Sequence, residues 1–333
     1  MKILTHKDAP IRVFGVPFFE EKKTLERLPG WLIEELHYGE KLGRRCPGAR
    51  LGFRTDASEF EIEISLEAPM SVDVGMSIFS CQSAEVRIGE RSRSRFAGLV
   101  NPPNYQTPTF RKKITKSNKL EEVTIFLPRN EIVKEVKLTF PDEALVEAPT
   151  PYRYGPVLYY GSSITEGGCC CRLTNAYNAL LSNRLDIDYY NFGFSGSAKG
   201  ELQAADYINT MEIKALVYDY DHNSPSVEHL QSTHEAFFKR IREKNPTLPV
   251  IMMGRPDFDY GNNAEERREV IYTTYRNAIA NGDKNVYYID SETFFGDVDR
   301  EQCTVDRVHP NDLGFYRMAS VVEPVLRAVF DIK

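Results

Sequence analysis

The sequence has no apolar run long enough to cross a membrane, no excess of basic residues and only one tryptophan, Trp31. A membrane helix needs roughly 18 or more consecutive apolar residues, so we do not expect a membrane protein. The 48 acidic residues outnumber the 42 basic ones, and the net charge of −6 argues against a broad surface for nucleic acid or anionic lipid. We therefore predict no nucleic-acid partner and no membrane partner, whereas a neutral substrate such as a sugar is compatible with this charge.

The start of the sequence also lacks the pattern of a secretory signal. Residues 1–16 contain no uninterrupted apolar segment and include Asp8 and Arg12, whereas a signal peptide needs an apolar stretch of about 7 to 15 residues. We therefore predict a cytoplasmic protein, in which cysteines are expected as reduced thiols rather than disulfides. The cysteines are Cys46, Cys81, Cys169, Cys170, Cys171 and Cys303.

The composition is that of a folded chain with room for two domains. Hydrophobic residues make up 41% and charged residues 27% of the 333 positions, which is ordinary for globular proteins and excludes a wholly disordered chain. Apolar and polar residues alternate in the first part, most regularly in Glu59–Leu66, as in a half-buried antiparallel strand. Weaker strands of this kind are predicted at Ser71–Phe79, Glu85–Ile88, Val123–Leu127 and Val136–Phe140. Several short strands separated by turn residues predict an antiparallel β-sandwich.

A proline-rich stretch separates this part from the rest. Residues Glu147–Pro156 include three prolines and a glycine, a composition typical of linkers. We predict a jelly-roll-like β-sandwich domain over residues 1–148 and a second domain over residues 155–333. In the second domain short apolar strands alternate with helices, which predicts an α/β fold with a parallel sheet covered on both faces. The predicted strands are Val157–Tyr160, Tyr189–Phe192, Ala215–Tyr220, Pro249–Met253 and Val286–Ile289, and the predicted helices are Asn175–Leu185, Glu201–Asn209, Ser226–Asn245, Ala264–Asn281 and Asp312–Phe330. Ser226 is expected as the N-cap of its helix.

Polar segments follow several of the predicted strands. Gly161–Thr165, Gly193–Gly196 and Asp221–Asn223 come after the first three, and Asp306–His309 stands between the fifth strand and the last helix. Because the carboxyl ends of parallel strands meet at one edge of a sheet, we expect these segments to converge there. Together they offer a hydroxyl, an imidazole, a carboxylate and hydrogen-bond donors for an oxyanion. This is the set of groups that acyl transfer requires.

The same segments resemble the sequence blocks of a known family. YYGSSITEGG, NFGFSGSAKGE, YDYDHN and CTVDRVHPNDLGF are similar, in this order, to the successive blocks of the SGNH (GDSL-like) hydrolases. The greatest similarity is to the branch with an N-terminal β-sandwich. The resemblance covers a little over half of the chain, and it implies a three-layer, flavodoxin-like parallel sheet for the second domain.

The resemblance also implies roles for individual residues. It implies that Ser163 is the nucleophile, that His309 is the general base and that Asp306 orients the imidazole. It further implies an oxyanion hole made by the backbone N–H groups of Ser163 and Gly196 and the side-chain amide of Asn223. Loss of one such donor typically lowers the rate by on the order of 10²–10³.

The sequence departs from the usual family pattern at two places. Ser162 stands where the first block usually has an aspartate, and Asp221–Ser224 replaces the usual Gly-x-Asn-Asp of the third block. We expect Ser162, His222 and Glu201 near the pocket. His222 is expected as a hydrogen-bonded wall rather than as the base. Glu201 opens a predicted helix, where an acidic residue is favourable in any case.

The resemblance implies a serine esterase that removes acetyl or other short acyl groups from carbohydrate esters through an acyl-serine intermediate, with no metal or organic cofactor. The alternatives are a short-chain lipase or thioesterase of the same fold, and a non-catalytic carbohydrate-binding protein. Gly193, Gly196 and Gly200 suggest a nucleotide-binding loop as a further alternative, but their spacing fits neither common phosphate-loop motif. The sugar is implied by the family resemblance and by the added β-sandwich, since no single residue points to it. A homo-oligomer is compatible with the sequence.

Three further features have a plain structural explanation. The consecutive cysteines Cys169–Cys171 cannot easily face one ion, because zinc sites usually space their cysteines by two to four residues. We predict no metal there and expect these cysteines to line the helix entry or the pocket wall. Trp31 could stack on a sugar, although packing is the default expectation. His229 and His234 are expected to belong to the surface or packing of their helix.

Overall fold

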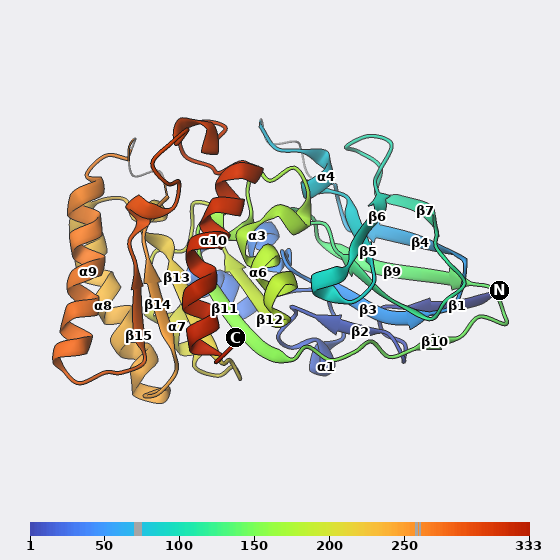
Figure 1. Ribbon diagram of the computed structural model, residues 1–333, viewed down its shortest axis with the longest axis horizontal. Coiled ribbons are helices and arrows are strands. Elements are labelled where there is room, and N and C mark those ends of the chain that lie inside the picture. Colours follow the sequence, from blue (N-terminus) through green and yellow to red (C-terminus); the bar gives the residue numbers. More distant parts are fainter. Residues whose placement is uncertain (70–74, 257–258, 260) are drawn as a thin grey trace.

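The computed structural model describes residues 1–69, 75–256, 259 and 261–333. Figure 1 shows a β-rich part beside a part in which helices cover a parallel sheet, with the amino terminus at the far end of the β-rich part. This architecture confirms the predicted fold class, an α/β unit preceded by antiparallel sheets.

The amino-terminal part consists of two antiparallel sheets that enclose a hydrophobic core. Glu59–Leu66 forms β4 with the predicted bounds, and its apolar positions Phe60, Ile62, Ile64 and Leu66 are buried. The first sheet has the order β1-β9-β4-β7, and the second has the order β10-β3-β8-β5-β6 with β2 beside β3. The strand bounds are β1 Lys2–Thr5, β2 Arg12–Phe14, β3 Arg50–Thr55, β5 Ala84–Ile88, β6 Arg95–Val100, β7 Thr109–Thr115, β8 Glu121–Phe126, β9 Val133–Phe140 and β10 Val146–Glu147.

The strand predicted at Ser71–Phe79 is wrong in the part that the structure describes. Residues 70–74 lie outside the described residues, and Ile78–Cys81 forms the short helix α4. The hydroxyl of Ser77 accepts the backbone N–H of Phe79 at 3.2 Å, and this local bond starts a helix instead of leaving the backbone free for strand pairing. Three further short helices were not predicted; they are α1 Phe19–Lys22, α2 Gly30–Leu36 and α3 Glu40–Arg44.

The carboxyl-terminal part contains the five predicted strands in one parallel sheet. Its order is β12-β11-β13-β14-β15. Numbered along the chain this is 2-1-3-4-5, the flavodoxin-like order, in which β11 lies at the topological switch point where such folds place their sites. The strand bounds are β11 Tyr154–Gly161, β12 Ile187–Gly193, β13 Ala215–Asp219, β14 Val250–Met253 and β15 Val286–Ile289.

Helices cover both faces of this sheet and make it a three-layer structure. Leu158 and Tyr160 of β11 share a buried cluster with α7, α8 and α9, whereas Val157 and Tyr159 share one with α6 and α10. Figure 1 shows these two helix groups on opposite sides of the strands. Ser226 is the predicted N-cap of α8, and its hydroxyl accepts the backbone N–H of His229. The helix bounds are α5 Ser163–Glu166, α6 Tyr177–Leu185, α7 Leu202–Ile208, α8 Val227–Lys244, α9 Ala264–Ala280 and α10 Asp312–Val329.

The amino-terminal segment also contributes to the core of the α/β unit. Leu32, Ile33 and Leu36 of α2 are buried in the same cluster as Ala204 and Ile208 of α7. The apolar face of α2 is therefore buried against the carboxyl-terminal part and not inside the sandwich. The boundary between a domain over 1–148 and one over 155–333 stays a prediction.

Candidate active site

Ser163 lies at the carboxyl edge of the sheet. It is the first residue of α5 and follows β11 after one residue, and β11 is flanked by β12 and β13. The hydroxyl of Ser162 caps α5 by accepting the backbone N–H of Ile164 at 3.1 Å. An aspartate at this position could cap the helix in the same way. A Cβ atom at Gly193 would overlap the backbone N of Glu166. Glycine there lets β12 approach the turn that carries Ser163.

A chain of two hydrogen bonds joins Ser163, His309 and Asp306. The Oγ of Ser163 is 2.9 Å from Nε2 of His309, and Nδ1 of His309 is 2.7 Å from Oδ2 of Asp306. An ionised carboxylate only accepts, so Nδ1 carries the hydrogen and Nε2 of the neutral ring is left as an acceptor for the serine hydroxyl. The structure therefore brings together three predicted residues, two of them 146 positions apart.

Asp306 is held in place by the loop that it shares with His309. Its Oδ1 accepts the backbone N–H groups of Val308 at 3.0 Å and of His309 at 2.7 Å. Partial burial alone would raise the pKa of Asp306, but these hydrogen bonds and the one to the imidazole outweigh it and lower the pKa below its usual range. Asp306 is thus the ionised orienting partner that a neutral imidazole needs.

The residues predicted to form an oxyanion hole lie on α5 and on the segments that follow β12 and β13. Asn223 donates from Nδ2 to the backbone oxygen of Phe194 at 2.9 Å, which ties the turn after β13 to the loop after β12. Gly196 in that loop has a positive φ of 65°, a conformation that glycine adopts readily. Over the described ranges of the chain, no acceptor bonds the backbone N–H of Ser163 or of Gly196. Both donors are therefore available.

His222 and Glu201 occupy different places. The ring of His222 lies edge-on to that of His309, with ring centroids 6.4 Å apart, and the Ser163 hydroxyl bonds His309. His222 thus lies beside His309, and its role as a wall of the pocket stays a prediction. Oε2 of Glu201 accepts the hydroxyls of Tyr38 and Tyr160, each at 2.7 Å. In the described parts of the chain no hydrogen bond links Glu201 to the three joined residues, and this geometry points to a structural role at the start of α7.

Comparison with known proteins identifies the family. A family model of the GDSL-like lipase/acylhydrolase family matches residues 155–327, more than half of the chain. The chain belongs to this family. No curated protein matches this acylhydrolase in sequence.

Solved structures resemble this acylhydrolase over its whole length. A candidate GDSL-like lipase from Bacteroides ovatus has a TM-score of 0.86 at 22% identity, covering 100% of this chain and 98% of that one. The salicylyl-acyltransferase SsfX3 of a tetracycline biosynthetic pathway has a TM-score of 0.79 at 17% identity, covering 99% and 98%. A family two carbohydrate esterase from Clostridium thermocellum, in complex with cellohexaose, has a TM-score of 0.63 at 13% identity, covering 88% and 97%. At these identities the likeness establishes the fold.

A buried charged cluster lies directly behind the Ser163 turn of this acylhydrolase. Glu166 of α5 is 2.9 Å from Nη2 of Arg45 and 3.3 Å from Nη2 of Arg27, and it accepts the hydroxyl of Ser195. Burial alone would raise the pKa of Glu166, but Arg45, Arg27 and Ser195 overcome this effect and lower the pKa. Glu166 is therefore an ionised anchor between the Ser163 turn and the loop after β12.

Arg27 extends this cluster to the loop that carries Gly196. Its guanidinium donates to the backbone oxygens of Asn191 and Gly193 and lies 3.9 Å from the ring centroid of Phe194. Arg27, a residue of the amino-terminal segment, thus binds the end of β12 and the start of the loop that follows it. Sequence reasoning missed this arrangement. Glu166 lies inside the quoted motif YYGSSITEGG, but nothing around Arg27 distinguishes it from the other basic residues.

A second buried carboxylate, that of Asp219, forms a hydrogen bond with the turn that carries Ser163. Oδ1 of Asp219 at the end of β13 accepts the hydroxyl of Thr165 at 2.5 Å, and Oδ2 accepts that of Tyr177 at 3.1 Å. Burial raises the pKa of Asp219 to about 7, although both hydroxyls oppose the shift. The Ser163 turn is therefore hydrogen-bonded to a carboxyl group that titrates near neutral pH, which the sequence did not indicate.

The consecutive cysteines diverge from one another. Cys169 and Cys170 are buried and Cys171 is exposed, and the backbone N–H of Cys171 donates to Oδ1 of Asp312 at 2.8 Å. Within residues 1–69, 75–256, 259 and 261–333, no group of three or more His, Cys, Asp or Glu side chains is arranged to hold a metal ion.

None of the helices formed by these residues is both long and apolar enough to span a bilayer.

Proposed function

We propose that the chain is a serine esterase that hydrolyses short acyl esters, with Ser163 as nucleophile. The Oγ of Ser163 forms a bond to the ester carbonyl carbon while its proton passes to Nε2 of His309. The N–H groups of Ser163 and Gly196 and the amide of Asn223 stabilise the developing oxyanion. The carbon–oxygen bond to the alcohol then breaks, the alcohol leaves with the proton from His309, and an acyl-serine remains.

Water completes the cycle by the same route in reverse. His309 takes a proton from water as it attacks the acyl carbon, the bond to Oγ breaks, and Ser163 recovers its proton. Asp306 holds the imidazole in the required tautomer in both halves of the cycle. The single observation that carries this proposal is the hydrogen-bonded chain from Ser163 through His309 to Asp306.

The proposed substrate is an acetylated or similarly short-acylated carbohydrate. Support comes from the fold shared with a family two carbohydrate esterase and with an acetyl xylan esterase from Butyrivibrio proteoclasticus, the latter at a TM-score of 0.61 and 12% identity over 99% of this chain and 98% of that one. Short-chain lipids and thioesters are the alternative substrates of the same chemistry. Hydrolysis of an acetylated xylan or mannan oligosaccharide, compared with longer p-nitrophenyl esters and an acyl-CoA, separates these substrates.

Transfer of the acyl group to an alcohol is a second candidate activity, because the acyltransferase SsfX3 shares the fold. The side chains of His309 and Asp306 are 24% and 49% exposed. The base and its orienting partner are therefore open to water, which supports hydrolysis. A cytoplasmic location, a homo-oligomer and the absence of a nucleic-acid partner stay predictions.

Cleavage of p-nitrophenyl acetate tests the esterase proposal. We expect the wild-type chain to release p-nitrophenol with burst kinetics or steady turnover, and Ser163→Ala to lose activity by on the order of 10³-fold or more. Ser320→Ala, which removes an exposed hydroxyl on α10, is the matched control and should retain wild-type rates. Equal activity of the Ser163→Ala and wild-type proteins would refute Ser163 as nucleophile. Activity in neither would refute the esterase itself and favour a binding protein.

A further inference from the structure

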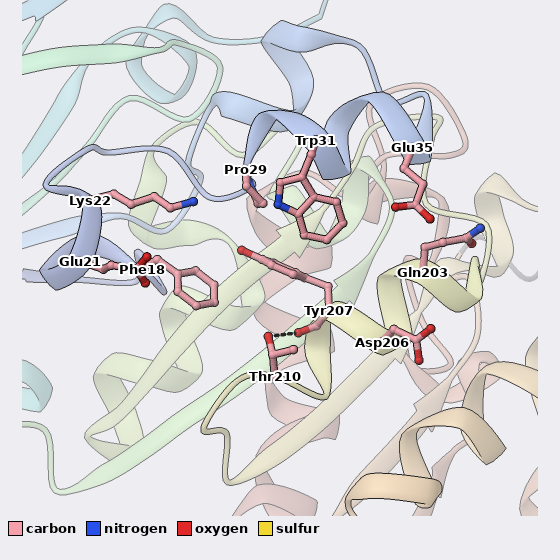
Figure 2. A pocket seen from close by; sticks show the side chains of 10 residues that line it. All are labelled: Phe18, Glu21, Lys22, Pro29, Trp31, Glu35, Gln203, Asp206, Tyr207 and Thr210. Carbon is pink, nitrogen blue, oxygen red and sulfur yellow. Dashed lines mark hydrogen bonds between the residues drawn. The ribbon is translucent and has the colours of Figure 1, made fainter.

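An open groove of about 450 Å³ lies between the amino-terminal segment and α7. Figure 2 shows Phe18, Trp31 and Glu35 on the amino-terminal side, facing Gln203 and Tyr207 on the α7 side. The groove exists only because α2 packs against α7. Neither Ser163 nor any other residue proposed for catalysis lines it.

The groove exposes the only tryptophan of the chain. The side chain of Trp31 is 60% exposed, although its neighbours Leu32 and Ile33 are buried. Its indole and the Tyr207 ring form a T-shaped contact, with ring centroids 6.2 Å apart and planes at 79°, while Phe18 packs against Tyr207 with centroids 5.5 Å apart. A large apolar ring left in solvent at the wall of a concavity is informative, because the core does not require it.

The groove also contains polar groups that have no protein partner. In the described segments no hydrogen bond or ion pair is formed by the indole N–H of Trp31 or by the side chains of Glu35 and Gln203. Burial and the nearby Glu21 carboxylate raise the pKa of Tyr207, so its hydroxyl remains a donor at neutral pH. A concave apolar surface with a few free donors and acceptors is the usual form of a small-molecule site.

We propose that this groove is a saccharide-binding site that holds a neutral sugar chain away from the catalytic serine. The apolar C–H face of a pyranose ring stacks on the exposed indole. Its hydroxyls donate to the carboxylate of Glu35 and both donate to and accept from the amide of Gln203. The groove is open, so a chain longer than the enclosed sugar can continue beyond it.

Charge and ring geometry select this ligand over others. Of the carboxylates that line the groove, Asp206 pairs with Arg240 at 3.4 Å, whereas Glu21 and Glu35 outnumber the one ammonium of Lys22. The lining is therefore net negative, which disfavours phosphates and uronic acids. The acidic residues would also attract an organic cation, but cation recognition by aromatic residues uses several ring faces around the charge. Here Tyr207 is only 8% exposed, so the indole of Trp31 offers the main free face. A single flat face suits a sugar ring.

The single tryptophan makes the proposal directly measurable. Ser163→Ala protein, which cannot turn over an ester by the proposed mechanism, is titrated with cellohexaose, xylohexaose, a hexagalacturonate and choline while Trp31 emission is recorded. We expect a saturable change in emission and protection from acrylamide quenching with at least one of the neutral hexasaccharides. No such change is expected with hexagalacturonate or choline. A response to neither neutral sugar, or a response to the anion or to choline instead, would overturn the proposal.

Variants then locate the binding. By calorimetry, Trp31→Ala should weaken the affinity for the responding sugar by about ten-fold or more, as loss of a central aromatic contact typically does, and Gln203→Ala should weaken it severalfold. Tyr316→Ala removes an aromatic residue that is 56% exposed on α10 and should leave the affinity unchanged. Undiminished affinity in Trp31→Ala would refute the site.

This test is independent of the proposed esterase activity. In the background that retains Ser163, Trp31→Ala should cleave p-nitrophenyl acetate at the wild-type rate, because the groove lies outside the catalytic residues. If the wild-type chain cleaves no ester but the sugar titration still responds, the esterase proposal fails and the binding site stands. A retained melting temperature in Trp31→Ala, expected for an exposed side chain, excludes unfolding as the cause of lost affinity.

Discussion

Asp306 illustrates how one side chain sets the chemistry of its neighbour. Two backbone N–H groups of its own loop fix the carboxylate, and its second oxygen faces Nδ1 of His309. The imidazole can therefore present Nε2 to Ser163 only as an acceptor. In an asparagine, an amide nitrogen would take the place of this oxygen. It would donate to Nδ1, and the ring hydrogen would then lie on Nε2.

We predict that Asp306→Asn lowers kcat for p-nitrophenyl acetate by on the order of 10⁴-fold with little change in KM, because the wrong tautomer leaves Ser163 without a base. Asp312→Asn is the control. Asp312 is a nearby carboxylate at the start of α10 that bonds Cys171 and Asn175, and its variant should stay within about two-fold in kcat. A loss of similar size in both variants would contradict the orienting role of Asp306.

Asp219 makes the stability of the Ser163 turn depend on pH. The pKa of Asp219 is about 7 in the folded chain, against an ordinary value of 3.8. Between these two pH values the folded protein therefore keeps a proton that the unfolded chain has released. The stability from this group is fully present below about pH 4 and is lost as the pH rises through 7.

We predict that the free energy of unfolding of the wild type falls relative to Asp219→Asn by about 3 kcal/mol between pH 5 and pH 8, since each pKa unit corresponds to about 1.4 kcal/mol. Urea unfolding of both proteins at several pH values measures this difference, in which contributions from all other groups cancel. A difference that does not change with pH would show that Asp219 is ionised in the folded state throughout.

At the scale of elements, the short helix α5 and the loop after β12 depend on partners outside the α/β unit. Glu166 joins α5 to Arg45 and Arg27, and Ser195 adds the loop to the same cluster. A four-residue helix has little stability of its own. Its position, and that of the donors beside Ser163, is therefore set by residues from the amino-terminal segment.

Two adjacent arginines allow a matched test of this cluster. We predict that Arg45→Met lowers the free energy of unfolding by about 3 kcal/mol, because it leaves a buried carboxylate with one partner fewer. It should also lower kcat for p-nitrophenyl acetate about ten-fold with a smaller change in KM, because the oxyanion donors move.

Arg44→Met is the control for this variant. Arg44 bonds Glu26, Glu40 and Glu67 nearer the surface, and its loss should change the stability by no more than about 1 kcal/mol and leave kcat unaltered. If Arg45→Met matched Arg44→Met in both stability and kcat, the cluster would have no role in positioning the site.

At the scale of the molecule, the two parts are joined by packing and by charge. Leu32 of α2 is 1% exposed inside the cluster that it shares with α7. Arg50 of β3 pairs with Asp188 of β12, and Thr174 donates to Glu85 of β5 at both its backbone and its hydroxyl. These contacts couple the stability of the sandwich to that of the parallel sheet.

We predict that the whole chain unfolds in one transition. Trp31 fluorescence reports on the amino-terminal segment, and circular dichroism at 222 nm reports mainly on the helices of the α/β unit, so both should give the same midpoint. Leu32→Ala, which removes buried apolar contacts worth about 2–5 kcal/mol, should lower both midpoints equally. A shift confined to the fluorescence signal would mean that α2 detaches from the α/β unit before the rest of the chain unfolds.

Elements with strong local patterns were predicted well. β4 has the predicted bounds because Glu59–Leu66 alternates without interruption, and the Ser226 cap of α8 is a bond between residues three apart. Helix α2 was missed, because a short helix depends on what it packs against. Arg27 was missed because its burial depends on Glu166, 139 positions away.

The sequence by itself determined the order of strands and helices in the α/β unit and the chemical groups at the strand ends, because periodicity, capping and turn chemistry act over a few residues. Only the tertiary structure decided that His309 reaches Ser163, that Arg27 and Arg45 stand behind the Ser163 turn, and that Trp31 lines a groove with α7. Each of these depends on packing between segments far apart in the chain, which no local pattern encodes.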